Sequence, residues 1–153
     1  MKPRLDPYQA APELLQAMLD LEMKVRASGL DAALLKLVKT RASLLNGCAY
    51  CVHMHTREAR AAGESEERLY LLSTWRESPL YTPRERAALA WTDALTLLAD
   101  THAPDDVYAE LSAHFNERER VALTLAIVTI NGWNRIAVGF RALHPTTTAS
   151  AAA

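Results

Sequence analysis

Apolar residues recur along most of the chain at intervals of three and four, the spacing that places them on one side of an α-helix. This repeat predicts helices over about residues 11–28, 31–45, 48–62, 65–75 and 82–100, a sixth from 104 through 111, and a last one over 117–143. Residues 1–9 are expected to be extended, because Pro3 and Pro7 oppose helix formation. No segment shows the alternation of a strand, so we predict an all-α bundle of about six to seven helices.

Capping signals mark several of these boundaries. Asp31 is a plausible N-cap, and Thr82 is followed by proline and then by Glu85, which together favour a helix start. Asn116 with Glu119 repeats the same pattern before the longest helix. The apolar run 121–130 within that helix is too short to span a bilayer, so we expect a buried core helix.

The bulk composition indicates one globular unit. We expect a single domain over residues 1–144 and a disordered tail over 145–153, among 153 residues in all. Half of the residues are hydrophobic, which suggests apolar surface that is covered by a second subunit. A net charge of −1 without long charged runs gives no indication of nucleic acid or an anionic membrane as partner. No signal peptide is visible, so we expect a cytoplasmic protein whose cysteines are kept reduced and serve catalysis rather than structure.

The stretch from Asn46 to His55 holds the only two cysteines. Cys48, Cys51 and His55 are spaced so that they fall on one face of a helix. Asn46 and Gly47 favour a turn, which would place both thiols in the first turn of a new helix. The positive end of the helix dipole lowers the pKa of a thiol there, and His55 could take its proton or pair with the thiolate. This pattern is typical of a dithiol that attacks with one sulfur and closes a disulfide with the other.

Other interpretations of the cysteine pair compete with redox chemistry. Cys48, Cys51, His53 and His55 could be zinc ligands, but a short helix points His53 away from the other three. Covalent haem attachment requires histidine directly after the second cysteine, where this chain has Val52. Two structural cysteines in a core would be inert.

The segment Arg41 to Arg60, read RASLLNGCAYCVHMHTREAR, resembles the alkylhydroperoxidase D-like core of the carboxymuconolactone decarboxylase family. Weaker similarity extends over residues 34–141, including 88–93 and 131–135. The resemblance implies an all-helical homo-oligomer, such as a trimer or a hexamer. It also implies that Cys51 reduces a hydroperoxide, Cys48 resolves the sulfenic acid, and His55 relays protons together with a carboxylate.

The chain departs from the family pattern at two positions. Tyr50 stands where well-known members have a histidine, and Lys36 where they have a glutamate. Asp93, which lies within an apolar stretch, is our candidate for the missing carboxylate, and Glu58 is a weaker alternative. Asp93 could instead belong to a solvated row, since Arg86, Asp93 and Asp100 recur every seven residues.

Several further polar residues are compatible with ordinary structural roles. Tyr50 could donate a hydrogen bond to a bound peroxide or pack in the core. Trp133, Asn134 and Arg135 fit helix packing or a subunit interface. Three histidines lie near predicted helix ends or in loops, where capping or solvation explains them: His102, His114 and His144.

The resemblance and the residues together predict an antioxidant thiol peroxidase that reduces organic hydroperoxides through the Cys48/Cys51 pair and recycles with a thiol or dithiol reductant. No metal or organic cofactor is expected. The alternatives are a thiol-disulfide oxidoreductase or redox sensor without peroxidase turnover, and a lactone decarboxylase. The decarboxylase is disfavoured because such enzymes act without the cysteine pair. The sequence does not identify the hydroperoxide, the reductant or the oligomer number.

Overall fold

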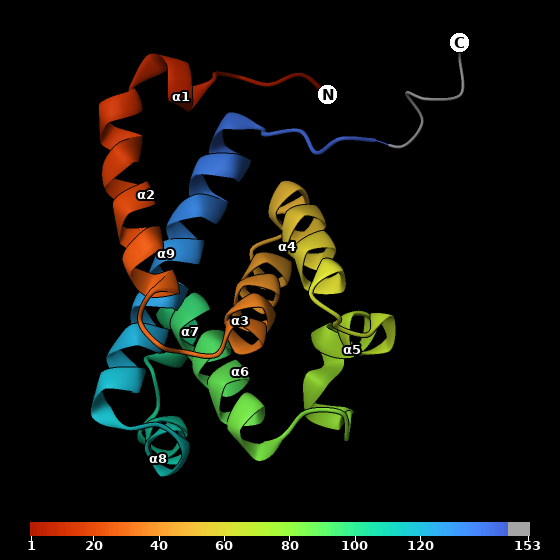
Figure 1. The fold of residues 1–153 in the computed structure, drawn as a ribbon, viewed down its shortest axis with the longest axis vertical. Helices are drawn as coiled ribbons and strands as arrows, with labels where there is room; N and C mark the ends of the chain where they lie inside the picture. The colour runs from red at the N-terminus through yellow and green to blue at the C-terminus, as the bar shows by residue number, and fades with distance from the viewer. Residues whose placement is uncertain (147–153) are drawn as a thin grey trace.

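The computed structural model describes residues 1–146, and within them all regular secondary structure is helical (Figure 1). Its elements are nine α-helices and one 3₁₀-helix: α1 (Pro7–Ala10), α2 (Pro12–Arg26), α3 (Ala32–Leu45), α4 (Ala49–Ala61), α5 (Glu66–Leu71), η1 (Leu72–Glu77), α6 (Pro83–Thr96), α7 (Leu98–Thr101), α8 (Asp105–His114) and α9 (Glu117–Phe140). The predicted all-α class is confirmed. The predicted disordered tail falls mostly on residues 147–153, which lie outside the described residues.

The predicted capping residues begin their helices as expected. Asp31 accepts a hydrogen bond from the N–H of Leu34, and reciprocal capping boxes join Thr82 with Glu85 and Asn116 with Glu119. These motifs satisfy backbone N–H groups that have no partner inside the helix. The starts of α3, α6 and α9 are therefore fixed by local sequence.

The helix count exceeds the predicted six to seven for two reasons. The expectation of an extended segment over residues 1–9 is wrong at its end, since Pro7 opens the single turn α1, with Asp6 as its N-cap. Proline is tolerated there because the first residue of a helix needs no N–H donor. The helix expected over 82–100 is interrupted at Leu97, which separates α6 from the short α7.

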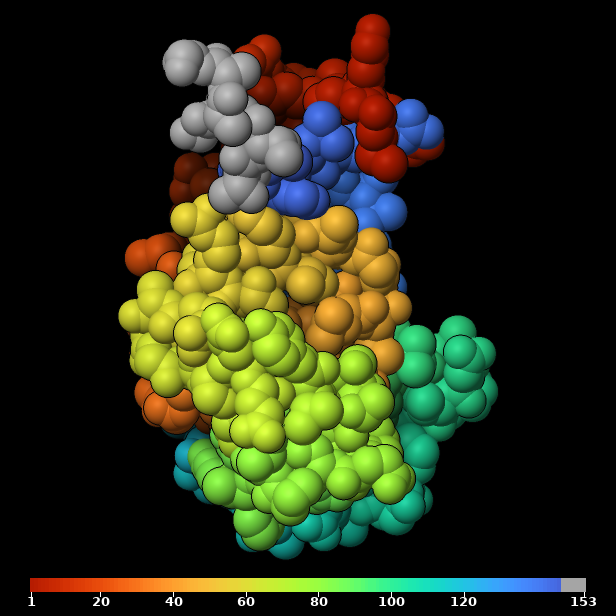
Figure 2. All heavy atoms as spheres, turned by 90° about the vertical axis from the view of Figure 1, so that its right-hand side faces the viewer, coloured from red at the N-terminus to blue at the C-terminus, as the bar shows by residue number. Residues whose placement is uncertain are grey.

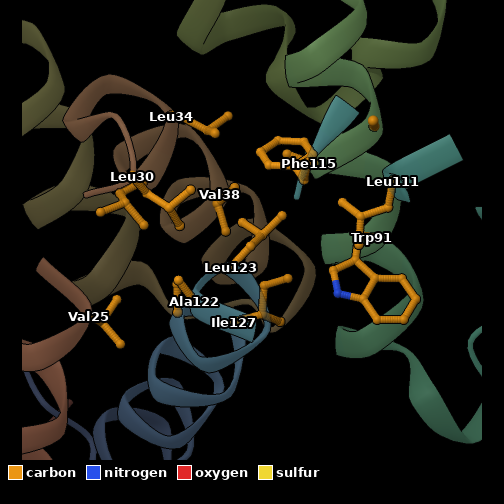
Figure 3. Packing of buried hydrophobic residues seen from close by; sticks show 14 of the residues in the cluster. Val25, Leu30, Leu34, Val38, Trp91, Leu111, Phe115, Ala122, Leu123 and Ile127 are labelled. Atoms are coloured by element: carbon orange, nitrogen blue, oxygen red, sulfur yellow. The ribbon is translucent and has the colours of Figure 1, made fainter. Parts of the chain in front are cut away.

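The main core lies where α3, α6, α8 and α9 meet, with α2 against α9 (Figure 1). Figure 3 shows side chains from all of these helices converging there, among them Leu34, Val38, Trp91, Phe115 and Leu123. A smaller apolar cluster joins α3, η1 and α6. α4 packs along α3 on the outer side of this core, which leaves one of its faces available for a site.

By length and composition alone, the longest helix, α9, could cross a membrane. Of its most apolar stretch, 39% is buried inside the protein. Core helices of soluble proteins meet the same criteria. Here α9 packs against α2, α3 and α6, in keeping with the core helix predicted from its apolar run.

Candidate active site

The turn between α3 and α4 places the two cysteines at the start of α4. Gly47 has φ +63°, in the left-handed region that favours glycine. The next residue, Cys48, donates its N–H to the carbonyl of Ser43 at 3.0 Å and so is held close to α3. Cys48 is the N-cap of α4, and its Sγ accepts the N–H of Cys51 at 3.3 Å. The predicted helix start at this point is confirmed.

Cys48 and Cys51 are joined by a disulfide, with their Cα atoms 5.3 Å apart. Both are buried, Cys51 with 2% of its surface exposed. They differ in what they face, because Cys51 lines a cavity and Cys48 does not. Small molecules that enter this cavity therefore reach Cys51 first.

The cavity has a volume of about 430 Å³ and lies between the N-terminal segment, α2, α4 and the C-terminal end of α9. Figure 2 shows the first residues and the end of α9 close together above the face formed by α4 and α5. Arg4 fixes the N-terminal segment in place, since its N–H and guanidinium donate to the carbonyls of Phe140 and Gly139 at 3.0 and 2.9 Å. The walls are largely apolar and include Leu5, Leu19, Met54, Ile130, Trp133, Ile136, Phe140 and Leu143.

His55 lies one turn after Cys51 and lines the same cavity. Its Nδ1 is 3.4 Å from Oε2 of Glu58, while its buried Nε2 has no hydrogen-bond partner among residues 1–146. Burial lowers the pKa of His55 below its ordinary value, and the ammonium of Lys39 acts in the same direction, against Glu58 and Glu22. The imidazole is therefore neutral at pH 7 and has one ring nitrogen free to exchange a proton.

A buried ion pair also lines the cavity. Lys39 on α3 contacts Oε1 of Glu22 on α2, and the two residues are 5% and 8% exposed. Arg26, which is largely exposed, donates its Nε–H to the same oxygen at 2.8 Å. Burial alone would raise the pKa of Glu22, but the hydrogen bonds from Lys39 and Arg26 lower it. Neither member of the pair was predicted from the sequence, although each is a charged residue within an apolar helical run, the same signal that made Asp93 a candidate.

Asp93 is buried, but its hydrogen-bond partners are two arginines and a tryptophan rather than His55. Its two oxygens accept Nε–H and Nη2–H of Arg41 at 2.7 and 3.1 Å. Trp75 and Arg76 also donate to it. It makes no hydrogen bond to His55 within the described residues and does not line the cavity. At 7% exposure it is not part of a solvated row either. The carboxylate next to His55 belongs to Glu58, the weaker of the two candidates.

The remaining candidate residues differ in whether they line the cavity. Trp133 and Tyr50 line the cavity, whereas Asn134 is buried between α9 and α3, where it donates to Ser43 at 3.0 Å. Arg135 is exposed and donates to Asn131 on its own helix. The cavity role of Trp133 was not expected, since the sequence favoured packing or an interface.

The other histidines lie outside the cavity. His53 stacks on His144 with ring centroids 4.8 Å apart, so it does not join the cysteines and His55. His102 ends α7 in the left-handed region, and His114 lies at the end of α8 beside Glu110. Within residues 1–146 no three histidine, cysteine or acidic side chains come together as metal ligands.

Comparison with known proteins identifies relatives of this chain. The chain is 40% identical over 138 residues to the uncharacterised protein YdfG of Bacillus subtilis, covering 90% of this chain and 94% of that protein. A crystal structure from Agrobacterium tumefaciens, of a protein of unknown function proposed to be the antioxidant defence protein AhpD, is 52% identical. It matches with a TM-score of 0.93 over 95% of this chain and 99% of that one.

More distant structures share the fold. The debrominase Bmp8 superimposes with a TM-score of 0.81 at 20% identity, over 90% of this chain and 74% of that one. The sequence profile of the carboxymuconolactone decarboxylase family matches residues 12–94, which include the cysteine pair and His55. The chain belongs to the carboxymuconolactone decarboxylase family, with a fold like that of AhpD.

Proposed function

We propose that this protein is a thiol peroxidase that reduces organic hydroperoxides. The observation that carries the proposal is the position of Cys51 and His55, which lie together in a largely apolar cavity with Nε2 of His55 unpartnered among the described residues. An apolar cavity favours a hydroperoxide with an organic body over a small polar one. The proposed antioxidant role of the Agrobacterium protein agrees with this function.

In the proposed cycle, the Cys51 thiolate attacks the terminal oxygen of the hydroperoxide. The O–O bond breaks, Cys51 becomes a sulfenic acid, and the alkoxide takes a proton delivered through His55 and leaves as the alcohol. The Cys48 thiol then attacks the Cys51 sulfur, which forms the disulfide and releases water. An external dithiol, or two thiol molecules, returns both cysteines to the reduced state.

The disulfide supports this pairing of roles, because it joins the cavity-lining sulfur to a second sulfur at the N-cap of the same helix. The alternative, a thiol-disulfide oxidoreductase acting on protein partners, requires a sulfur that a macromolecule can reach. Both sulfurs are buried here, which favours small molecules. No step of the cycle needs a metal or an organic cofactor.

We also propose that the protein is a cytoplasmic homo-oligomer, a trimer or a hexamer. Val121, Leu125 and Val128 follow one another along α9 at helical spacing and are exposed in the single chain. A row of exposed apolar side chains on one helix favours contact with another subunit. Size-exclusion chromatography with light scattering tests the oligomeric state, and a monomeric mass would contradict it.

The decisive experiment is stopped-flow oxidation of the reduced protein by cumene hydroperoxide, with mass spectrometry of the products, on wild type, Cys51→Ser and Cys48→Ser. We expect a Cys48–Cys51 disulfide in wild type, a sulfenic acid on Cys51 in Cys48→Ser, and no rapid reaction in Cys51→Ser. If all three proteins react no faster than a free thiol, the peroxidase function is excluded. Lactone decarboxylation that survives Cys51→Ser would support the decarboxylase alternative instead.

A further inference from the structure

We propose that Lys39, held in place by Glu22, is the counter-ion of the Cys51 thiolate in the reduced protein. Lys39 is therefore a positioning residue of the site, acting through the charge it places beside the cavity. The inference rests on the proposed role of Cys51 as nucleophile. Beside a reactive cysteine, a protonated histidine often stabilises the thiolate by its charge. In this protein we assign that role to a lysine.

Lys39 is the more deeply buried of the two cations in the cavity wall. The ionisable residues that line the cavity are Asp6, Tyr8, Glu22, Arg26, Lys39, Tyr50 and His55. Of the two cations in this set, the side chain of Arg26 is 57% exposed and that of Lys39 is 6% exposed. Water screens the charge of Arg26 far more than that of Lys39, so Lys39 dominates the positive potential inside the cavity. The stretch of α9 that lines the cavity adds only apolar side chains.

Glu22 is shared between two cations. Lys39 and Arg26 both contact the same oxygen of Glu22, so one carboxylate stands against two cations. Because Arg26 takes up part of the charge of Glu22 from the solvent side, Glu22 does not fully cancel Lys39, and an excess of positive charge remains on the cavity side. Burying an ion pair is costly, and such pairs are weak contributors to stability, so the presence of one in the wall of the cavity that Cys51 lines favours a functional role. A thiolate on Cys51 would balance the excess charge.

His55 does not supply the positive charge. An imidazolium is disfavoured there, because the ring is buried and lies within the field of Lys39. The groups that oppose this effect are Glu58 on the same helix, which is 45% exposed, and Glu22, which is itself paired. A neutral His55 can accept or deliver a proton but cannot stabilise the thiolate by its charge. The cation required for that purpose is Lys39.

The test measures the pKa of Cys51 directly, without any hydroperoxide. In a reduced Cys48→Ser background, only Cys51 contributes a thiolate, whose ultraviolet absorbance is followed against pH. We expect Lys39→Met to raise the pKa of Cys51 by about one unit or more, the change typical of losing a nearby opposite charge. Lys39→Arg, which keeps the charge, should stay close to the parent protein.

Lys36→Met is the matched control, because Lys36 lies one turn earlier on α3 and does not line the cavity. The proposal is overturned if Lys39→Met changes the pKa of Cys51 no more than Lys36→Met does. If Lys39→Met does not fold, Glu22→Gln/Lys39→Met, which leaves no unpaired buried charge, should still raise the pKa, though by less. An unchanged pKa in that double variant also overturns the proposal.

The outcome is separate from that of the proposed function. A raised pKa in Lys39→Met together with slow hydroperoxide reduction by wild type would support the counter-ion and exclude the peroxidase. Rapid hydroperoxide reduction with an unchanged pKa would support the peroxidase and exclude the counter-ion.

Discussion

Asn46, in the turn before the cysteines, donates a hydrogen bond to Oδ1 of Asn134 on α9 across 2.9 Å. The same amide group also donates to Asn131, and Asn134 in turn donates to Ser43 on α3. Ser43 is the residue whose carbonyl accepts the N–H of Cys48. The cysteine turn is thus tied to the core helix by a buried network of side-chain amides.

Asn134→Ala should lower the free energy of unfolding by about 2 kcal/mol, because two buried hydrogen bonds are lost and their partners lose part of their pairing. Denaturation by urea measures this change. Val138→Ala, one turn further along α9 at an exposed position, serves as the control and should have little effect. Equal stability of the two variants would show that the network contributes nothing measurable.

Asp93→Asn should be more destabilising, by about 3 kcal/mol, since it leaves Arg41 buried without its carboxylate. The refolded variant should still form the Cys48–Cys51 disulfide at the wild-type rate, because Asp93 lies outside the cavity. Asp100→Asn, at an exposed position, is the control for stability. Slower disulfide formation in folded Asp93→Asn would restore Asp93 as a participant in the proton relay.

These residues show what the sequence could and could not predict. Helix starts at Asp31, Thr82 and Asn116 depend on residues three positions apart, so the local sequence was sufficient. The break at Leu97 has no glycine or proline to announce it, and the chain continues with another apolar residue, so a continuous helix was the natural expectation.

The residues of the site also differ in how far the sequence could predict them. Cys48, Cys51 and His55 lie within two turns of one helix, so their spacing alone indicated that they belong together. Lys39 and Glu22 meet between two helices, 17 residues apart in sequence, and only the packing of α2 and α3 against α9 brings them to the cavity. The sequence left open whether Asp93 is buried or belongs to a solvated row, and the structure has it buried. Its partner was not predictable, because several basic residues compete with one histidine for a buried acid.

The pH dependence of stability should carry a contribution from His55. Because its pKa is lower in the folded protein than the ordinary value of 6.5, the unfolded chain binds more protons below about that pH. His55 therefore opposes folding as the pH falls through 6.5 and towards its folded pKa, and it has no such effect at higher pH.

Urea denaturation across this range should show a loss of stability in wild type that is smaller in His55→Gln. His114→Gln, a change at the half-exposed end of α8, is the control. If wild type and His55→Gln lose stability in parallel as the pH falls, the imidazole is not held neutral by burial.

Trp133 should determine the preference for organic hydroperoxides. It lines the cavity from α9, the helix to whose end Arg4 binds the N-terminal segment. Replacing it by alanine removes a large apolar surface from the wall while leaving Cys51 and His55 untouched. We expect Trp133→Ala to lower kcat/KM for cumene hydroperoxide about tenfold, which corresponds to the loss of part of one aromatic contact.

The measurement that decides this prediction is the ratio of kcat/KM for cumene hydroperoxide to kcat/KM for hydrogen peroxide. Hydrogen peroxide has no organic body to contact the wall, so its kcat/KM should change little in Trp133→Ala. Tyr70→Ala, which removes an exposed aromatic ring outside this cavity, should leave both values unchanged. An equal loss for both substrates would mean that Trp133 supports the position of Cys51 rather than the binding of substrate. In that case the apolar cavity would not be the origin of the preference for organic hydroperoxides.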